Sequence, residues 1–156
     1  MIKLRQVRRD DFQQLCEIYQ QIHDIHVESI PNVFKKAQAL SQEYFDALLA
    51  NENVHFVVAE EGDILVGLCI SELRPSNDIP VLRKRTLLSV ESVGVREGWK
   101  GKRVGTKLFA DAEKFARKNR ADDMVLNVYD FNENAIHFYE KVGFKSLSRR
   151  MEKTLK

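Results

Sequence analysis

The stretch that decides the fold is Val93–Gly105, Val-Gly-Val-Arg-Glu-Gly-Trp-Lys-Gly-Lys-Arg-Val-Gly, in which a basic, glycine-containing loop follows a strand-like segment. An amphipathic run begins at once, with apolar residues on one face at helical spacing: Val104, Leu108, Phe109, Ala112, Phe115 and Ala116. This pattern predicts a strand that turns tightly into a helix over residues 104–118. The first N–H groups of such a helix are unpaired, and they point at the loop together with the positive end of the helix dipole.

The loop adds two further features of an anion site. Gly101 and Gly105 let a ligand approach the backbone closely. Positive charge comes from Lys100, Lys102 and Arg103. Because free amides at a helix N-terminus bind phosphate groups, the residues alone predict a phosphate or pyrophosphate site at this loop.

The composition limits the classes of protein to which this chain can belong. The 156 residues are 44% hydrophobic and 31% charged, which predicts one domain over residues 1–156 with a single core. The 25 basic and 23 acidic residues give a net charge of +2, so we expect no nucleic-acid partner. Cys16 and Cys69 both lie in apolar runs, which favours buried thiols over a disulfide or a metal pair.

Metal, membrane and secretion signals are weak in this sequence. The four histidines are scattered, so we expect no metal site. No apolar run is long enough to span a bilayer, and the first residues do not form the apolar core of a signal peptide. We therefore expect no membrane association and a cytoplasmic location.

The order of predicted elements indicates an α/β protein with a mixed sheet. Hairpin-connected strands come first and a crossover through a helix comes later. The nearly continuous apolar run Met124–Tyr129 suggests a strand buried on both faces. We expect strands at residues 2–7, 55–60, 64–73, 86–95 and 124–129, with residues 144–155 finishing the sheet. We expect helices that begin near Asp10 or Asp11, after Ser41, at Val104 and after Asn132.

A second segment, Asn132–Phe144 (Asn-Glu-Asn-Ala-Ile-His-Phe-Tyr-Glu-Lys-Val-Gly-Phe), completes a family pattern. Together with Val93–Gly105 and the element order of essentially the whole chain, it resembles the GNAT superfamily of acetyl-CoA-dependent N-acetyltransferases. The family loop usually reads Arg/Gln-x-x-Gly-x-Gly/Ala. Lys100 stands at its first position and Gly105 at its last, but Arg103 replaces the middle glycine, either at some loss of close backbone approach or with its side chain turned outward.

The resemblance implies a GNAT fold, with a mostly antiparallel central sheet, a splayed parallel strand pair and about four flanking helices. It also implies acetyl-CoA as the co-substrate, with its pyrophosphate against the amides of residues 101–106, which include Val104 and Thr106. The pantetheine arm would pair with the strand that ends at Val93 and Val95, which in this family often carries a bulge. Asn132 would contact the pantetheine and is also an ordinary helix N-cap.

Two residues are candidates for catalysis. The resemblance implies that Tyr139 is the general acid for the leaving thiolate, and the alternative is a core tyrosine. Glu91 interrupts an apolar strand where similar proteins often carry a glutamate, which suggests a general base. A solvent-facing strand residue is the alternative for Glu91. His23 and His26 lie in the region that lines the acceptor site in this family, although a structural role is more usual for a lone histidine.

The resulting hypothesis is direct transfer of an acetyl group from acetyl-CoA to a primary amine in a ternary complex, without a metal. The acceptor is a small-molecule amine or a peptide amine, and a homodimer stays open. The main alternative is a non-catalytic acyl-CoA-binding sensor or interaction module, for which Arg103 is the sequence support. A nucleotide-binding loop fits less well, because no Gly-Lys-Ser/Thr sequence follows.

Overall fold

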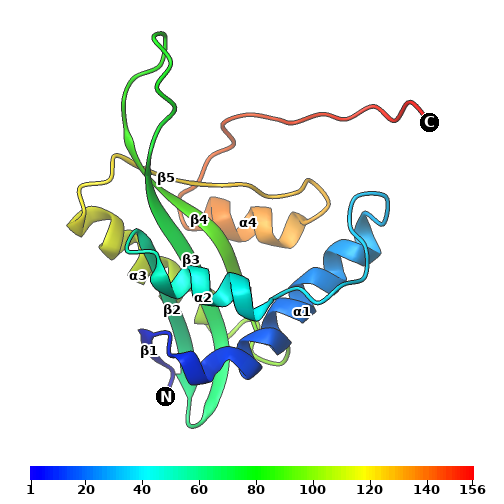
Figure 1. Cartoon of the computed structure of the whole chain (residues 1–156), viewed down its shortest axis with the longest axis vertical. Helices are drawn as coiled ribbons and strands as arrows, with labels where there is room; N and C mark the ends of the chain where they lie inside the picture. The colour runs from blue at the N-terminus through cyan, green and yellow to red at the C-terminus, as the bar shows by residue number, and fades with distance from the viewer.

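The computed structural model describes all of residues 1–156 and contains a single sheet of five strands in the order β1-β2-β3-β4-β5 (Figure 1). The first four strands are antiparallel neighbours, and β5 is parallel to β4, which confirms the predicted mixed sheet. The strands are β1 (Lys3–Gln6), β2 (Val54–Glu61), β3 (Ile64–Pro75), β4 (Thr86–Val95) and β5 (Asp123–Leu126).

Four α-helices flank this sheet, as expected. They are α1 (Phe12–Ser29), which follows a short 3-10 turn, α2 (Gln42–Ala50), α3 (Val104–Lys118) and α4 (Glu133–Lys141). Ser41 caps α2 by accepting a hydrogen bond from the Tyr44 N–H at 3.1 Å, as predicted. None of these helices is both long enough and apolar enough to cross a membrane.

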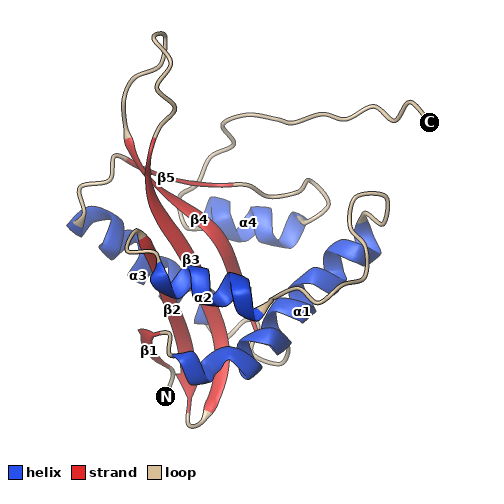
Figure 2. Cartoon of the chain, viewed as in Figure 1, coloured by secondary structure: helices blue, strands red, loops and turns tan.

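The core has two layers, one on each face of the sheet. Figure 2 shows α1 and α2 in front of the strands and α3 behind them. The layer under α1 and α2 contains Leu15, Ile18, Phe45, Phe56, Val58, Leu68 and Ile70. The layer under α3 contains Val57, Val66, Cys69, Leu88, Val90, Leu108, Phe109 and Ala112. Because β3 contributes to both layers, the middle of the sheet is its most buried part.

An extra residue in β4 changes the course of the sheet. Ser71 of β3 pairs with Val90, but Ile70 pairs with Ser92, so Glu91 has no partner on β3. Such a bulge shifts the alternation of side chains by one position. Residues on both sides of the bulge therefore pack on the α3 face: Leu88, Val90, Val93 and Val95.

The parallel pair β4 and β5 separates at the same point. Pairing covers only Leu87–Val90 with Asp123–Leu126. Beyond it, no strand pairs with Glu91–Val95 on the side away from β3. The backbone edge of β4 is therefore open where the chain turns into α3, as the resemblance implied.

Two strand predictions were wrong. Residues 144–155 do not finish the sheet, and residues 145–156 are exposed and extend beyond the rest of the molecule (Figure 1). The strand predicted at 124–129 is only Asp123–Leu126, and none of its residues is buried. Both errors have one physical cause, because β5 has no neighbour on its outer side to extend its pairing or cover it.

Two glycines let the first turn of α3 lie between β3 and α4. A Cβ atom on Gly67 of β3 would lie 2.8 Å from Cγ1 of Val104 and 3.0 Å from the carbonyl oxygen of Gly94. A Cβ atom on Gly105 would lie 3.2 Å from Cζ of Phe138 in α4. The start of α3 is thus held by close packing from both sides.

Gly67→Ala is expected to lower the free energy of unfolding by about 1–3 kcal/mol, because the added methyl group overlaps Val104 and a backbone carbonyl. Urea unfolding followed by circular dichroism measures the change. Lys114→Ala, on the exposed face of α3, is the control and should stay within about 0.5 kcal/mol of the parent. An unchanged midpoint for Gly67→Ala would show that α3 does not approach β3 as closely as described.

Candidate functional site

The loop between β4 and α3 is anchored by side chains of α1. Nε2 of Gln21 donates to the Val95 carbonyl at 2.9 Å, and Oε1 of the same side chain accepts from the Glu97 N–H at 2.8 Å. Nη1 of Arg96 pairs with the Glu17 carboxylate at 2.6 Å. Nothing in the sequence pointed to Gln21, because its partners are 74 and 76 residues away. These contacts fix the loop relative to α1.

The first turn of α3 presents unpaired amides, as the sequence predicted. Neither the backbone nor a capping side chain accepts a hydrogen bond from the N–H groups of Val104, Gly105 and Thr106. Arg103, the N-cap residue, has φ 63°, a left-handed conformation. Such a conformation costs a non-glycine residue about 1–2 kcal/mol. Arg103 therefore keeps the kind of backbone conformation that glycine adopts easily, and its side chain is exposed.

The basic side chains of the loop have different partners. Nζ of Lys100 lies 2.9 Å from the Glu97 carboxylate, and this hydrogen bond lowers the pKa of Glu97. Nζ of Lys102 lies 4.4 Å from the centroid of the Trp99 ring, a cation–π contact. Both lysines therefore contact the loop itself, while their charge still lies close to the free amides.

Asn132 and Asn127 lie beyond β5, across the opening from β4. Oδ1 of Asn132 accepts from the Ala135 N–H at 3.4 Å, which confirms the predicted N-cap of α4. Asn127 follows the last paired residue of β5 and is exposed. Asn127 lines a hollow with Ser89 of β4, next to the place where the two parallel strands separate.

Tyr139 lies in α4 against an aromatic cluster. Its ring centroid is 5.6 Å from that of Phe109 and 6.1 Å from that of Phe144. Burial raises the pKa of its phenol, so the hydroxyl holds its proton at neutral pH. Cys69, in the same apolar cluster, is a free thiol whose pKa burial raises to about 12. The prediction of a buried thiol is therefore confirmed for Cys69, whereas Cys16 is only half-buried.

Glu91 lies at the bulge, where the two parallel strands begin to separate. Its carboxylate forms an ion pair with Arg74 of β3, and 35% of its side chain is exposed. The sequence placed Glu91 correctly on the central strand but gave no sign of Arg74 as its partner.

An aromatic cluster links α1 to the segment after β5. The His26 ring is surrounded by three others, with centroids 5.1 Å away at Phe34, 5.7 Å at Tyr129 and 5.3 Å at Phe131. Its Nδ1 lies 2.9 Å from the Ile22 carbonyl and must donate that hydrogen bond, which leaves Nε2 as the acceptor of the neutral ring. His26 was a candidate from the sequence, but its aromatic partners were not predicted, because they lie in segments far from it along the chain.

A second polar group lies buried under α1. The hydroxyl of Tyr19 has no hydrogen-bond partner, and burial raises its pKa to about 12. His23, in contrast, is tied to the loop after α1, with Nε2 2.8 Å from the Lys35 carbonyl. His23 therefore has a structural partner, whereas the Tyr19 hydroxyl is unsatisfied.

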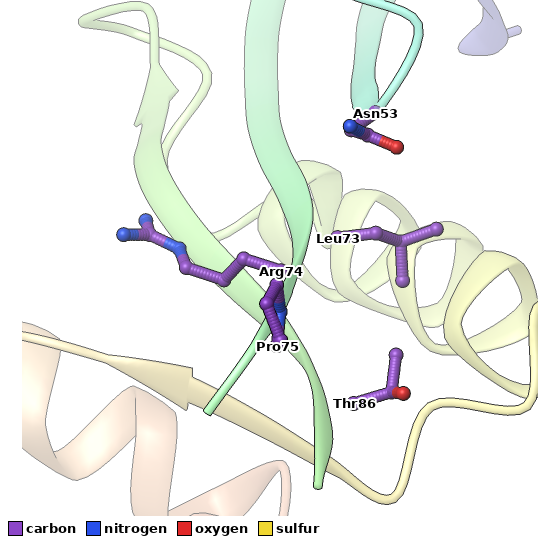
Figure 3. Close-up of a pocket in the computed structure, with 5 residues that line it drawn as sticks. All are labelled: Asn53, Leu73, Arg74, Pro75 and Thr86. Carbon is purple, nitrogen blue, oxygen red and sulfur yellow. The ribbon is translucent and has the colours of Figure 1, made fainter. Parts of the chain in front are cut away.

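Two open hollows lie on the sheet away from the start of α3. One, of about 330 Å³, is lined by Asn53, Leu73, Arg74, Pro75 and Thr86, and Figure 3 shows the Arg74 side chain pointing away from the others. The other, of about 280 Å³, includes Arg74, Ser89 and Asn127 and so lies beside the ion pair of Glu91. No group of three or more histidine, cysteine or acidic side chains is placed to hold a metal ion.

Curated relatives share sequence with this chain over different lengths. An uncharacterised N-acetyltransferase of Methanocaldococcus jannaschii is 25% identical over 142 residues, which cover 91% of this chain and 60% of the relative. A streptothricin acetyltransferase of Streptomyces lavendulae is 39% identical over 57 residues, 36% of this chain and 30% of the relative. The chain thus spans 60% or less of the length of these relatives.

Solved structures show the same fold. A tetramutant of a Bacillus halodurans protein superposes with a TM-score of 0.94 at 23% identity, covering 98% of this chain and 99% of that one. An aminoglycoside N-acetyltransferase in complex with CoA superposes with a TM-score of 0.79 at 12% identity, covering 99% of this chain and 94% of that one.

The family assignment comes from a match along the sequence itself. The model of the acetyltransferase (GNAT) family matches residues 13–144, which include the loop before α3, the bulge in β4 and the whole of α4. Both quoted motifs lie within this range, and so do the predicted elements apart from the first strand and the last predicted segment, residues 144–155. The chain therefore belongs to the acetyltransferase (GNAT) family.

Proposed function

We propose that residues 1–156 form one N-acetyltransferase domain, which transfers an acetyl group from acetyl-CoA to a primary amine by direct attack in a ternary complex. The observation that carries this proposal is the row of unpaired amides at the start of α3, next to the open backbone edge of β4. The N-acetyltransferases among the relatives support it.

Residues of this chain suit both the pyrophosphate and the pantetheine arm of acetyl-CoA. The loop and first turn at residues 101–106 suit a pyrophosphate, because the N–H groups of Val104, Gly105 and Thr106 are free donors at the positive end of α3. Lys100, Lys102 and Arg103 add positive charge around them. Val93 and Val95 offer a strand edge for the amides of pantetheine, and Asn132 stands at the start of α4 across the opening.

When bound, acetyl-CoA would supply an acyl carbon that a neutral amine attacks, with a thiol as the leaving group. Tyr139 suits the role of general acid, since its buried phenol is protonated at neutral pH. Glu91 is the candidate base, because its ionised carboxylate can accept a proton from the acceptor ammonium directly or through water.

The non-catalytic alternative loses its sequence support in this structure. It rested on Arg103 in place of a glycine, but Arg103 adopts φ 63° and leaves the amides that follow it free. The backbone therefore keeps a shape suited to a phosphate. These amides suit CoA binding by either kind of protein, and the N-acetyltransferases among the relatives favour an enzyme.

The acceptor is a small-molecule amine or a peptide amine. We expect it to approach from the side of α1, where His26, Tyr129 and Phe131 gather after the end of β5. The deciding experiment is a thiol-release screen with acetyl-CoA against a broad library of primary amines and peptides. Turnover with at least one acceptor is expected, and CoA binding without thiol release across the library would favour the sensor module.

Gly101→Asp is expected to weaken CoA binding at least about tenfold relative to Gly101→Asn, a difference of about 1.4 kcal/mol. Gly101 has φ 79° and open space where a Cβ atom would be. Asn and Asp have the same shape and tolerate this conformation equally, so the pair isolates the added negative charge. Isothermal titration calorimetry with CoA provides the readout. Equal affinities would place the pyrophosphate elsewhere, and Gly105 is avoided because its Cβ would contact Phe138.

Tyr139→Phe is expected to lower kcat by about ten- to a thousandfold, the range for losing a positioned proton donor. The phenylalanine ring keeps the contacts with Phe109 and Phe144, so affinity for acetyl-CoA should stay unchanged. Tyr44→Phe, an exposed tyrosine on α2, is the matched control. Single-turnover kinetics measure the rate of the chemical step. A wild-type rate for Tyr139→Phe would show that Tyr139 is only a core tyrosine.

Glu91→Gln is expected to lower kcat/KM most near neutral pH, with partial recovery in alkali where the acceptor amine is already neutral. Arg74→Gln is the matched control, because it breaks the same ion pair but leaves the carboxylate in place. The two pH–rate profiles should therefore differ. Parallel profiles for the two variants would show that Glu91 serves only to pair with Arg74.

A further inference from the structure

The hollow of about 280 Å³ lies on the face of β4 and β5 that is turned away from α3. Leu88 of β4 and Leu126 of β5 pack in the layer under α3. Their neighbours Ser89 and Val125 line the hollow. Because successive side chains of a strand point to opposite faces, the hollow opens on the same side of the sheet as α1 and α2.

An ion pair between β3 and β4 borders this hollow. Arg74 lines the hollow, and its guanidinium pairs with the Glu91 carboxylate at the bulge. Figure 3 shows that the Arg74 side chain leaves β3 on the side opposite to Leu73, which packs in the layer under α3. The side chains of Arg74 and Glu91 are 44% and 35% exposed. A ligand in the hollow can therefore reach both charges.

This ion pair lies beside the open edge of β4, unlike the other ion pair at the hollow. Nη1 of Arg85 pairs with Asp123 at 2.9 Å, at the residue where β5 begins. Asp123 is the neighbour of Leu87, and from Leu87 to Glu91 the strand rises by about 13 Å. At Glu91 the pairing with β5 has ended. Arg74 is therefore the arginine of the hollow whose charge lies at the candidate base.

An ammonium group alone does not match this ion pair. An ammonium that approaches the Glu91 carboxylate also approaches the Arg74 guanidinium, and like charges side by side oppose binding. A carboxylate on the carbon that carries the ammonium removes this mismatch, because it can pair with the guanidinium while the ammonium pairs with Glu91. The four charges then alternate in sign and sum to zero. A zwitterion therefore complements the ion pair better than a simple amine or a peptide N-terminus does.

We propose that the acceptor is a free α-amino acid, which binds with its ammonium at Glu91 and its carboxylate at Arg74. This inference rests on the proposed function and narrows its acceptor to a small molecule that carries a carboxylate next to the amine. In the reaction, a C–N bond to the acetyl group forms and the C–S bond of acetyl-CoA breaks. The nitrogen gives up two protons, of which one ends on the CoA thiol and the other in solvent. Arg74 is thus a specificity-determining residue.

Thiol-release kinetics with acetyl-CoA test the acceptor class on matched compounds: each standard amino acid, its C-terminal amide and its decarboxylated amine. The best free amino acid is expected to have a kcat/KM at least about tenfold above that of its amide. The amine of the amide loses its proton more easily, which by itself would favour the amide. Equal or faster turnover of the amides or the decarboxylated amines would overturn this inference but keep the proposed function. Thiol release with none of the compounds, nor with the broader library, would overturn both.

Arg74→Gln tests whether the guanidinium causes this preference. The ratio of kcat/KM for the amino acid to that for its amide should fall in this variant to about one, because the partner of the substrate carboxylate is lost. Lys84→Gln is the matched control, since it removes the same charge from an ion pair with Asp78 in the loop after β3, where both side chains are 83% exposed. Its ratio should equal that of the parent chain. An unchanged ratio in Arg74→Gln, or an equal fall in both variants, would overturn the assignment of Arg74. Circular dichroism of each variant verifies that the domain is folded.

Discussion

The unmatched residue in β4 is the constraint on which the rest of the molecule depends. Because Glu91 has no partner on β3, Val93 and Val95 return to the face that α3 covers, and the Gly94 position faces Ile18 and Ile22 of α1. The pairing with β5 ends at the same place. One additional residue therefore repacks the end of the strand and opens its backbone edge. A regular strand would have kept that edge closed and sent these valines to the opposite face.

The start of α3 is rigid for reasons that combine near and distant residues. The glycines at 67 and 105 remove the side chains that would push this turn away from β3 and α4. Gln21 and Arg96 fix the preceding loop to α1 and β3 with short hydrogen bonds. The left-handed conformation of Arg103 costs about 1–2 kcal/mol, which the interactions of the surrounding structure must offset. Free amides held in this way need little reorganisation to bind an anion.

Local patterns predicted the parts of the fold that local chemistry controls. Ser41 and Asn132 are N-caps because their side chains reach amides three residues away, and the apolar stripe of α3 lies on the core. The unpaired amides at the start of α3 could also be predicted, since they belong to one continuous segment. The pairing of Glu91 with Arg74 and the aromatic cluster around His26 were not, because each joins segments that only the folded sheet brings together. Periodicity carries no information about such partners.

The wrong prediction at residues 144–155 is informative for the same reason. The sequence predicted that these residues finish the sheet, but a strand is stable only beside another strand that supplies its hydrogen bonds. Residues 145–156 have no neighbouring strand, and β5 has no strand on its outer side. A sequence pattern specifies that a segment can pair, whereas the fold decides with what.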